Sequence, residues 1–271
     1  MTALAVSAAA VVGTMSGCSP ASPDPLIQLS ITQFVAFGDS ITAGEIPDST
    51  DTSLGRIRPM VVHPYDLAYP VRLQELLNQR FPVESFTVTN AGCQGEAASG
   101  PYTLERFDAV VAGQGWDGTI DGCNNPPVPP LKHVDGVILL EGVNDLGPNG
   151  DHGIPEAIAA LRTMIRTARG RGAKVIVGTL LPQVPPLLRA TTPDLIVPFN
   201  AQLVPMATAE GALVVDLYTP FLTNTAEWIS PLDGLHPTAA GYQEMALLFF
   251  NAIQSTYEVT LSVGHPVPFP H

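Results

Sequence analysis

A serine follows directly on a short apolar run in the first quarter of the chain. The run Phe34–Phe37 is continuous in its hydrophobicity, and Gly38, Asp39 and Ser40 come immediately after it. A serine hydroxyl can attack a carbonyl carbon when a neighbouring base takes its proton, and open α/β sheets place their ligands just beyond the carboxyl ends of strands. The same Gly-Asp-Ser sequence also occurs in ordinary turns, so Ser40 needs further partners before it indicates catalysis.

Three later segments carry glycine, amide, acid and imidazole groups in corresponding positions. Two of them follow apolar runs directly, and the third precedes the last expected helix. Each segment is weak evidence by itself, but four of them in order at the ends of expected elements make a specific signal. In chain order the later segments are Asn90-Ala91-Gly92, Gly142-Val143-Asn144-Asp145 and Asp233-Gly234-Leu235-His236-Pro237.

In this order the four segments resemble those of the SGNH or GDSL hydrolase superfamily, and the resemblance covers nearly the whole mature chain. It implies that Ser40 is the nucleophile and that His236 is the general base, which then protonates the leaving alcohol. Asp233 would fix the imidazole tautomer and stabilise the imidazolium. The oxyanion hole would comprise the backbone N–H groups of Ser40 and Gly92 and the side-chain amide of Asn144. The resemblance implies no metal and no cofactor.

The elements that must position these residues alternate between short apolar runs and helix-like stretches. This pattern is typical of a parallel sheet that helices cover on both faces. We therefore predict one three-layer α/β/α domain with a five-stranded, mainly parallel sheet, the flavodoxin-like fold of SGNH hydrolases. The expected strands are Phe34–Phe37, Phe86–Thr89, Gly136–Leu140, Lys174–Leu180 and Leu213–Leu217, and the expected helices are Tyr69–Gln79, Pro155–Arg171, Leu195–Ala209 and Ala239–Gln254.

Three long connections rich in Pro or Gly interrupt this pattern. Loops of such length usually build a site or carry no fixed structure, and we expect substrate selectivity to reside in them. They are Glu45–Tyr69, Ser99–His133 and Leu181–Pro193. Three apolar residues just ahead of the segment with the histidine are candidates for an acyl pocket, although large aromatics more often serve as plain core packing. They are Phe221, Trp228 and Ile229.

The N-terminus has the features of an export signal. Leu4–Gly13 is an uncharged apolar run that is too short to span a bilayer, and Met15, Ser16, Gly17 and Cys18 follow it. The segment resembles the lipobox of bacterial lipoproteins, in which the cysteine is acylated and becomes the new N-terminus. An ordinary secretory signal peptide is the alternative. Either interpretation predicts a secreted or cell-envelope protein with a signal peptide over residues 1–17 and a tether over residues 18–30.

Two further cysteines follow in the body of the chain. If Cys18 carries lipid, Cys93 and Cys123 form an even pair in an oxidising compartment. We expect a disulfide between them that closes a loop of about 30 residues and stabilises the fold by a few kcal/mol. Two buried free thiols are the alternative.

The charge balance excludes several classes of partner. Acidic residues outnumber basic ones by 25 to 12, which gives a formal net charge of −13. Such a surface repels nucleic acid and anionic membranes, so membrane association would need the lipid anchor.

The remaining histidines lack the spacing of metal ligands. We expect a monomeric domain over residues 31–257, followed by a Pro-rich tail over residues 258–271.

The predicted activity is the hydrolysis of carboxylic acid esters through an acyl-enzyme, with short- to medium-chain acyl esters as the expected substrates. The superfamily leaves a carbohydrate deacetylase of the acetylxylan type, a lysophospholipase and a thioesterase open as alternatives. A catalytically silent surface-binding protein on the same fold is the alternative outside enzymes. A nucleotide-binding protein is disfavoured, because neither G-x-G-x-x-G nor a P-loop sequence occurs.

Overall fold

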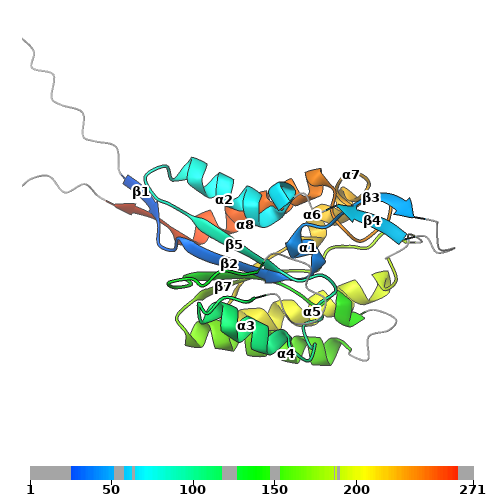
Figure 1. The fold of residues 1–271 in the computed structure, drawn as a ribbon, viewed down its shortest axis with the longest axis horizontal. Coiled ribbons are helices and arrows are strands. Elements are labelled where there is room, and N and C mark those ends of the chain that lie inside the picture. The colour runs from blue at the N-terminus through cyan, green and yellow to red at the C-terminus, as the bar shows by residue number, and fades with distance from the viewer. Residues whose placement is uncertain are drawn as a thin grey trace, which may run out of the picture.

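The structure is a computed structural model, and it describes residues 26–51, 58–62, 65–117, 127–146, 153–185, 187 and 190–261. Within these residues, five parallel strands form one sheet in the order β5-β2-β6-β7-β8, and helices cover both of its faces (Figure 1). The predicted three-layer α/β/α fold is confirmed. The strands are β2 (Gln33–Gly38), β5 (Thr87–Gly92), β6 (Gly136–Leu140), β7 (Lys174–Gly178) and β8 (Leu213–Val215).

The central strands are short, apolar and buried on both faces, as their continuous hydrophobicity predicts. Every residue of β6 is buried, and in β2 only Gln33 is partly exposed. Each large apolar side chain that is fully buried contributes about 1.5–3 kcal/mol. These strands therefore form the rigid centre from which the site residues extend.

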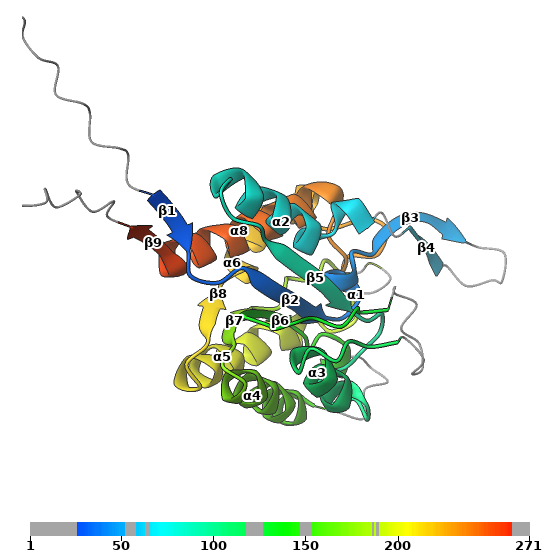
Figure 2. The same ribbon diagram turned by 60° about the vertical axis from the view of Figure 1, so that its left-hand side comes forward.

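Five longer helices form the two outer layers. Helices α2 and α8 lie against each other on one face of the sheet, and α3, α4 and α5 cover the other face (Figures 1 and 2). In α4 the residues Ile158, Leu161, Ile165 and Ala168 are buried, as their helical spacing predicts. The helices are α2 (Tyr69–Arg80), α3 (Thr103–Val111), α4 (Ile154–Gly170), α5 (Pro193–Ala209) and α8 (Ala239–Tyr257).

The register of the sheet brings the ends of three strands to one level. Gly38 at the end of β2 pairs with Gly92 at the end of β5 and with Leu140 at the end of β6. The segments that continue from these strands must therefore emerge side by side. Glycine is required where they meet, because a Cβ on Gly92 would lie 2.2 Å from the backbone nitrogen of Ala43.

Two of the connections that we expected to be irregular contain regular elements. Helix α3 lies within the predicted loop Ser99–His133, and Phe107, Val110 and Val111 on one side of it are buried. Glycines and prolines near this short segment concealed its helical spacing. In the predicted loop Glu45–Tyr69, two strands pair as an antiparallel hairpin. The shorter elements are α1 (Ser40–Ala43), β3 (Ile46–Asp51), β4 (Arg58–Val62), η1 (Tyr65–Leu67), η2 (Asn144–Leu146), α6 (Tyr218–Thr223) and α7 (Thr225–Trp228).

The ordered structure extends beyond the predicted domain limits at residues 31 and 257. Strand β1 (Leu26–Leu29) pairs antiparallel with strand β9 (Glu258–Leu261), so part of the expected tether and part of the expected tail form a small second sheet. This sheet lies at the end of the molecule opposite to α1 (Figures 1 and 2). Sequence reasoning missed it, because the two strands are short and lie more than two hundred residues apart in the chain.

Several predicted features lie outside the described residues. They include the apolar leader, Cys18, Cys123 and the end of the Pro-rich tail. In the part of the chain that is described, no helix is long and apolar enough to cross a membrane.

Candidate active site

The loop between α7 and α8 holds His236 and Asp233 in a fixed arrangement. The His236 carbonyl accepts a hydrogen bond from the Ser230 amide at 2.8 Å, and the Gly234 amide donates to the Ser230 carbonyl at 2.9 Å. Oδ1 of Asp233 accepts from the backbone amides of Leu235 and His236 at 3.0 and 3.1 Å. One carboxylate oxygen therefore organises the loop, which leaves the other to face the imidazole.

Ser40, His236 and Asp233 form a continuous hydrogen-bonded chain. Nε2 of His236 lies 2.9 Å from Oγ of Ser40, and Nδ1 lies 2.5 Å from Oδ2 of Asp233. Ser40 and His236 are 196 positions apart in the sequence, and both are buried, with exposed fractions of 4% and 0%. The fold thus brings together the nucleophile, the base and the orienting acid that the sequence predicts, with the geometry of a catalytic triad.

Short-range backbone geometry places Ser40 at the first position of α1. The preceding Asp39 is the N-cap of this helix, and its side chain accepts a hydrogen bond from the Ile41 amide at 2.8 Å. The Asp39 carboxylate therefore stabilises the turn into α1. Burial raises the pKa of Asp39 to about 7, although the Ile41 amide and the charge of His236 oppose this shift.

The triad carries opposite pKa shifts on its two titratable members. Burial alone would lower the pKa of His236, but hydrogen bonds to Asp233 and Glu45 raise it above the ordinary value for histidine. Burial would raise the pKa of Asp233, but hydrogen bonds from His236 and from backbone amides lower it below its ordinary value. These shifts favour an aspartate anion that stabilises an imidazolium.

The expected oxyanion donors follow three neighbouring strands at the same edge of the sheet. The Asn144 side-chain nitrogen donates to the Glu96 carbonyl at 2.7 Å, which orients the amide and leaves its second hydrogen for another acceptor. Ser40 is the first residue of α1, where the helix itself offers no acceptor for the N–H group. The Gly92 N–H donates to Oδ1 of Asn90 at 2.9 Å, so it would join the hole by sharing or exchanging this bond.

Asn90 and Asp145 connect the loops around the site. Nδ2 of Asn90 lies 3.4 Å from the carbonyl of Ala43 at the end of α1. The Asp145 carboxylate is fully buried and accepts from the amides of Ala98 and Ser99 and from the Ser99 hydroxyl, at 2.6–3.0 Å. These contacts give Asn90 and Asp145 structural roles in the loops around the site.

A second group of buried charges is hydrogen-bonded to the segments that carry the expected oxyanion donors. Arg106 on α3 forms a double hydrogen-bonded ion pair with Glu96, donates to the Ala91 carbonyl at 2.9 Å and lies over the ring of Phe37. The neighbouring Glu141 is buried, and neither of its carboxylate oxygens has a hydrogen-bond partner among the described residues. Sequence reasoning did not find this group, because its members come from separate loops and α3.

One residue beside the triad was also missed. Oε2 of Glu45 lies 3.2 Å from Nε2 of His236, the same nitrogen that faces Ser40. Glu45 is buried, with 5% of its surface exposed. A single acid five residues after the serine matches no motif, so only the folded structure shows this contact.

The three acyl-pocket candidates lie in the segment that leads into the loop with His236. Phe221 and Ile229 are buried in the hydrophobic core, and the rings of Phe221 and Trp228 are 5.1 Å apart. Ile229 also forms a β-bridge with Pro237, next to His236. Their contacts therefore support the loop that carries His236. Cys93 is buried at the end of β5, and its expected partner lies outside the described residues, so the disulfide stays a prediction.

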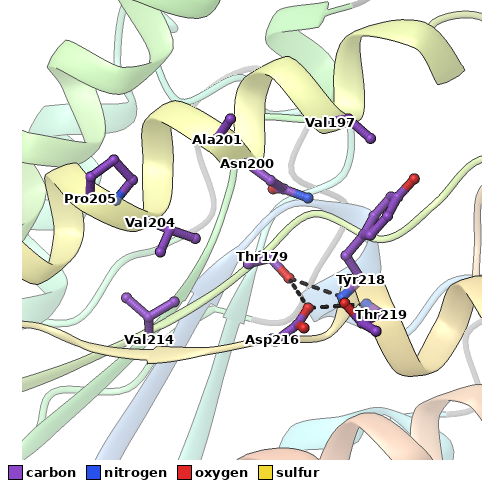
Figure 3. Close-up of a pocket in the computed structure, with 10 residues that line it drawn as sticks. All are labelled: Thr179, Val197, Asn200, Ala201, Val204, Pro205, Val214, Asp216, Tyr218 and Thr219. Carbon is purple, nitrogen blue, oxygen red and sulfur yellow. Dashed lines mark hydrogen bonds between the residues drawn. The ribbon is translucent and has the colours of Figure 1, made fainter.

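A hollow of about 650 Å³ lies between α5 and the turn from β8 to α6 (Figure 3). Several of its polar groups are hydrogen-bonded to the surrounding backbone, among them Asn200, which exchanges two hydrogen bonds with the backbone of Leu180. The Thr179 hydroxyl accepts from the amide of Tyr218 at 3.0 Å, and Asp216 accepts from the amide of Thr219 at 3.0 Å. None of its lining residues belongs to the triad or to the expected oxyanion hole. Among the residues that the structure describes, no cluster of His, Cys, Asp and Glu is arranged to hold a metal ion.

The fold and the arrangement of Ser40, His236 and Asp233 place this molecule among the hydrolases. The GDSL-like lipase/acylhydrolase family model matches residues 36–244, a range that includes Ser40, Asp233 and His236. The chain belongs to this family, as the order of its sequence segments predicts. A search of curated protein sequences returns no match.

Solved structures share the fold over most of the chain. A carbohydrate acetylesterase from Sinorhizobium meliloti matches 83% of this chain and 100% of its own, with a TM-score of 0.61 and 15% identity. A lipase/acylhydrolase from Enterococcus faecalis matches 84% and 97%, with a TM-score of 0.61 and 21% identity. An acetylxylan esterase from Geobacillus stearothermophilus matches 82% and 94%, with a TM-score of 0.57 and 19% identity. Similarity at this level of identity supports the shared fold.

Proposed function

We propose that this protein is a serine esterase that hydrolyses carboxylic acid esters through an acyl-enzyme intermediate. The observation that carries the proposal is the hydrogen-bonded chain from Ser40 through His236 to Asp233. Ester hydrolysis needs a nucleophile, a base of suitable pKa and an acid that holds the base in one tautomer. These three groups lie in direct contact at the sheet edge where the expected oxyanion donors also emerge.

Acylation begins when Nε2 of His236 takes the hydroxyl proton of Ser40. The serine oxygen forms a bond with the ester carbonyl carbon, and the carbonyl electron pair moves to its oxygen to give a tetrahedral oxyanion. The amides of Ser40 and Asn144 would bind that oxygen, and Gly92 would contribute after exchange with Asn90. When the intermediate collapses, the ester C–O bond breaks and Nε2 gives its proton to the leaving alcohol.

Deacylation repeats the same steps with water as the nucleophile. His236 takes a proton from water, and the resulting hydroxide bonds to the acyl carbon and forms a second tetrahedral intermediate. The bond from carbon to Ser40 then breaks, the serine oxygen regains its proton from Nε2, and the carboxylic acid leaves. Throughout the cycle Asp233 remains an anion that faces Nδ1.

Loss of the nucleophile or the base tests this mechanism. We expect Ser40→Ala and His236→Ala each to lower kcat for p-nitrophenyl butyrate by about 10⁶-fold, because each removes an essential member of the proton-transfer chain. A fluorophosphonate probe should label the wild type and fail to label Ser40→Ala. Ser255→Ala is the matched control, since that hydroxyl is exposed on α8 and donates to the Ala252 carbonyl within the same helix. Substantial hydrolysis by folded Ser40→Ala would contradict the proposed function.

We propose short- to medium-chain acyl esters as substrates, within the range that the family covers. A series of p-nitrophenyl esters with acyl chains of two to sixteen carbons tests this choice, with acetylated xylan assayed beside it. A maximum of kcat/KM at four to eight carbons is the expected result. A sharp preference for acetyl groups together with release of acetate from xylan would instead identify a carbohydrate deacetylase.

We also propose that the enzyme is exported and anchored through a lipid on Cys18, because of the lipobox-like sequence that precedes this residue. Mass spectrometry of the mature N-terminus in membrane and soluble fractions provides the test. An acylated N-terminal cysteine in the membrane fraction is expected. A soluble protein with an unmodified Cys18 would support an ordinary signal peptide.

A further inference from the structure

A second carboxylate faces the catalytic nitrogen of His236. Nε2 lies 2.9 Å from Oγ of Ser40 and 3.2 Å from Oε2 of Glu45, while Nδ1 contacts Asp233 on the opposite side of the ring. The imidazole is therefore flanked by an acid at each of its nitrogens. A triad needs an acid only at Nδ1, so the acid at Nε2 requires its own explanation.

The backbone on both sides of Glu45 is fixed, so this contact is built into the fold. The Glu45 amide donates to the Ser40 carbonyl at 3.0 Å, and the Glu45 carbonyl accepts from the hydroxyl of Tyr242 on α8 at 2.7 Å. Gly44, which precedes Glu45, adopts a φ of +94°, and a Cβ on this residue would lie 2.5 Å from the Cβ of Ala68. The turn that ends α1 thus places Glu45 beside the nucleophile and holds it there.

The proton count at Nε2 determines whether this contact is favourable. When the imidazole is neutral with its proton on Nδ1, the lone pair of Nε2 accepts from the Ser40 hydroxyl and also faces the carboxylate, which is unfavourable. When His236 has taken the serine proton, its Nε2–H points toward both oxygen atoms, and Glu45 becomes a hydrogen-bond acceptor for a cation. The carboxylate therefore stabilises the state of His236 that exists in each tetrahedral intermediate.

We propose that Glu45 is a further catalytic residue, which stabilises the imidazolium of His236 during acylation and deacylation and retains that proton in the free enzyme at low pH. The inference rests on the proposed esterase function, since it assigns a role within the same proton-transfer cycle. With Glu45 beside it, deprotonated His236 is a stronger base. At the same time His236 stays protonated, and so unable to take the serine proton, up to a higher pH.

The charges around the ring all act in the same direction. Asp233 from its own loop and Glu45 from the turn after α1 accept hydrogen bonds from His236, and both raise the pKa of the imidazole against the effect of its burial. Asp39, ahead of α1, also interacts electrostatically with His236. On α8, Tyr242 donates to the Glu45 carbonyl, and burial together with nearby acids raises its pKa well above the ordinary value, so it stays neutral.

Glu45→Gln removes the charge and retains nearly the same shape. We expect the acidic limb of the kcat/KM profile to move to lower pH by roughly half a unit or more, because an uncharged neighbour no longer favours the protonated imidazole. On the alkaline plateau we expect kcat and kcat/KM to fall together by about tenfold, since the stabilisation is lost only after His236 has taken a proton. KM should change little.

Glu75→Gln is the matched control. It makes the same change in net charge at an exposed position on α2, where Glu75 pairs with Arg72. This variant should keep the wild-type pH profile and plateau. Glu45→Asp keeps the charge at a shorter reach and should give a limb between those of the wild type and Glu45→Gln, which also provides a usable variant if Glu45→Gln does not fold.

A direct titration separates this inference from the esterase proposal. NMR spectra of the ¹⁵N-labelled imidazole report the protonation of His236 without any turnover, in the wild type, Glu45→Gln and Glu75→Gln. A lower titration midpoint in Glu45→Gln alone is the expected result. Equal midpoints and equal acidic limbs in all three proteins would overturn the role of Glu45. If the midpoint shifts but Ser40→Ala retains full hydrolysis, the esterase mechanism is wrong and the electrostatic coupling stands.

Discussion

Two groups of buried carboxylates lie near the carboxyl ends of the strands, and each is neutralised in its own way. The first group, Asp233 and Glu45, faces the two nitrogens of His236. The second group surrounds Arg106 and consists of Glu96, which pairs with it, and Glu141 close by. One group has a cation that gains and loses a proton, whereas the other has a guanidinium that is permanently charged.

Because only one of the two cations can titrate, one group of carboxylates is suited to a role in catalysis and the other to a structural role. A histidine between two acids can store and release one proton, so its surroundings tune a reaction. An arginine between acids cannot titrate, so its ion pair fixes the positions of loops. Arg106 binds both Glu96 and the Ala91 carbonyl, and the Glu96 carbonyl in turn accepts from Asn144. The second group therefore holds expected oxyanion donors in position and takes no part in proton transfer.

The comparison predicts that the two buried aspartates Asp233 and Asp39 contribute very differently to kcat. Asp233→Asn should lower kcat by about 10⁴-fold, because an amide at Nδ1 no longer fixes the tautomer or stabilises the imidazolium. Asp39→Asn is the control, since Asp39 is buried next to Ser40 and its carboxylate accepts from the Ile41 amide at the start of α1. Its asparagine variant retains an N-cap oxygen and should stay within a few-fold of the wild type. Michaelis kinetics at alkaline pH provide the measurement, and similar losses in both variants would remove the distinction.

Arg106→Met tests the supporting role of the second group. Removal of the guanidinium leaves Glu96 as an unpaired buried charge, which typically costs about 3–5 kcal/mol. Denaturant unfolding of Arg106→Met should show this loss, and the double variant Arg106→Met/Glu96→Gln should recover part of it, because the orphaned charge is then gone. Equal stabilities of the single and double variants would contradict the interpretation of the pair as a charge-balanced support.

The sequence predicted the fold and the triad because their signals are local. Each central strand is a continuous apolar run, and the polar residues of the site stand directly at the ends of such runs or beside the last helix. Asp233 and His236 lie three residues apart, so their contact follows from one turn of the chain. The folded chain then brings Ser40, just beyond the carboxyl end of β2, next to His236 in the loop ahead of α8, across 196 positions.

The sequence did not predict the contacts that depend on where loops fold back. Glu45 meets His236 only because the turn after α1 and the hydroxyl of Tyr242 on α8 fix its backbone. Arg106 lies in α3, which we had assigned to an irregular loop, so its pairing with Glu96 was not visible. Single charged residues without a motif look like ordinary surface groups in a sequence, and burial is what gives them a role.

Glu141 carries the smallest expected effect and the most specific dependence on pH. Burial, followed by the charges of Glu96 and Asp39, raises its pKa well above 4.5, so the folded protein keeps it protonated while the unfolded chain ionises it. As pH rises above about 4.5, the unfolded state therefore loses a proton that the folded state retains, and the free energy of unfolding falls. Glutamine cannot ionise, so Glu141→Gln should abolish this part of the fall.

Denaturant unfolding at about pH 4 and about pH 8 measures this effect. Relative to the wild type, Glu141→Gln should be more stable at the higher pH than at the lower one, whatever constant offset the new amide introduces. Asp39 also lowers the free energy of unfolding as pH rises to about 7, and it does so in both proteins. Its contribution therefore cancels when the two free energies of unfolding are subtracted. Glu75→Gln, at an exposed position, should run parallel to the wild type. If the free energy of unfolding of Glu141→Gln changes with pH as that of the wild type does, Glu141 is ionised in the folded protein. Its charge is then balanced by another group and not by a bound proton.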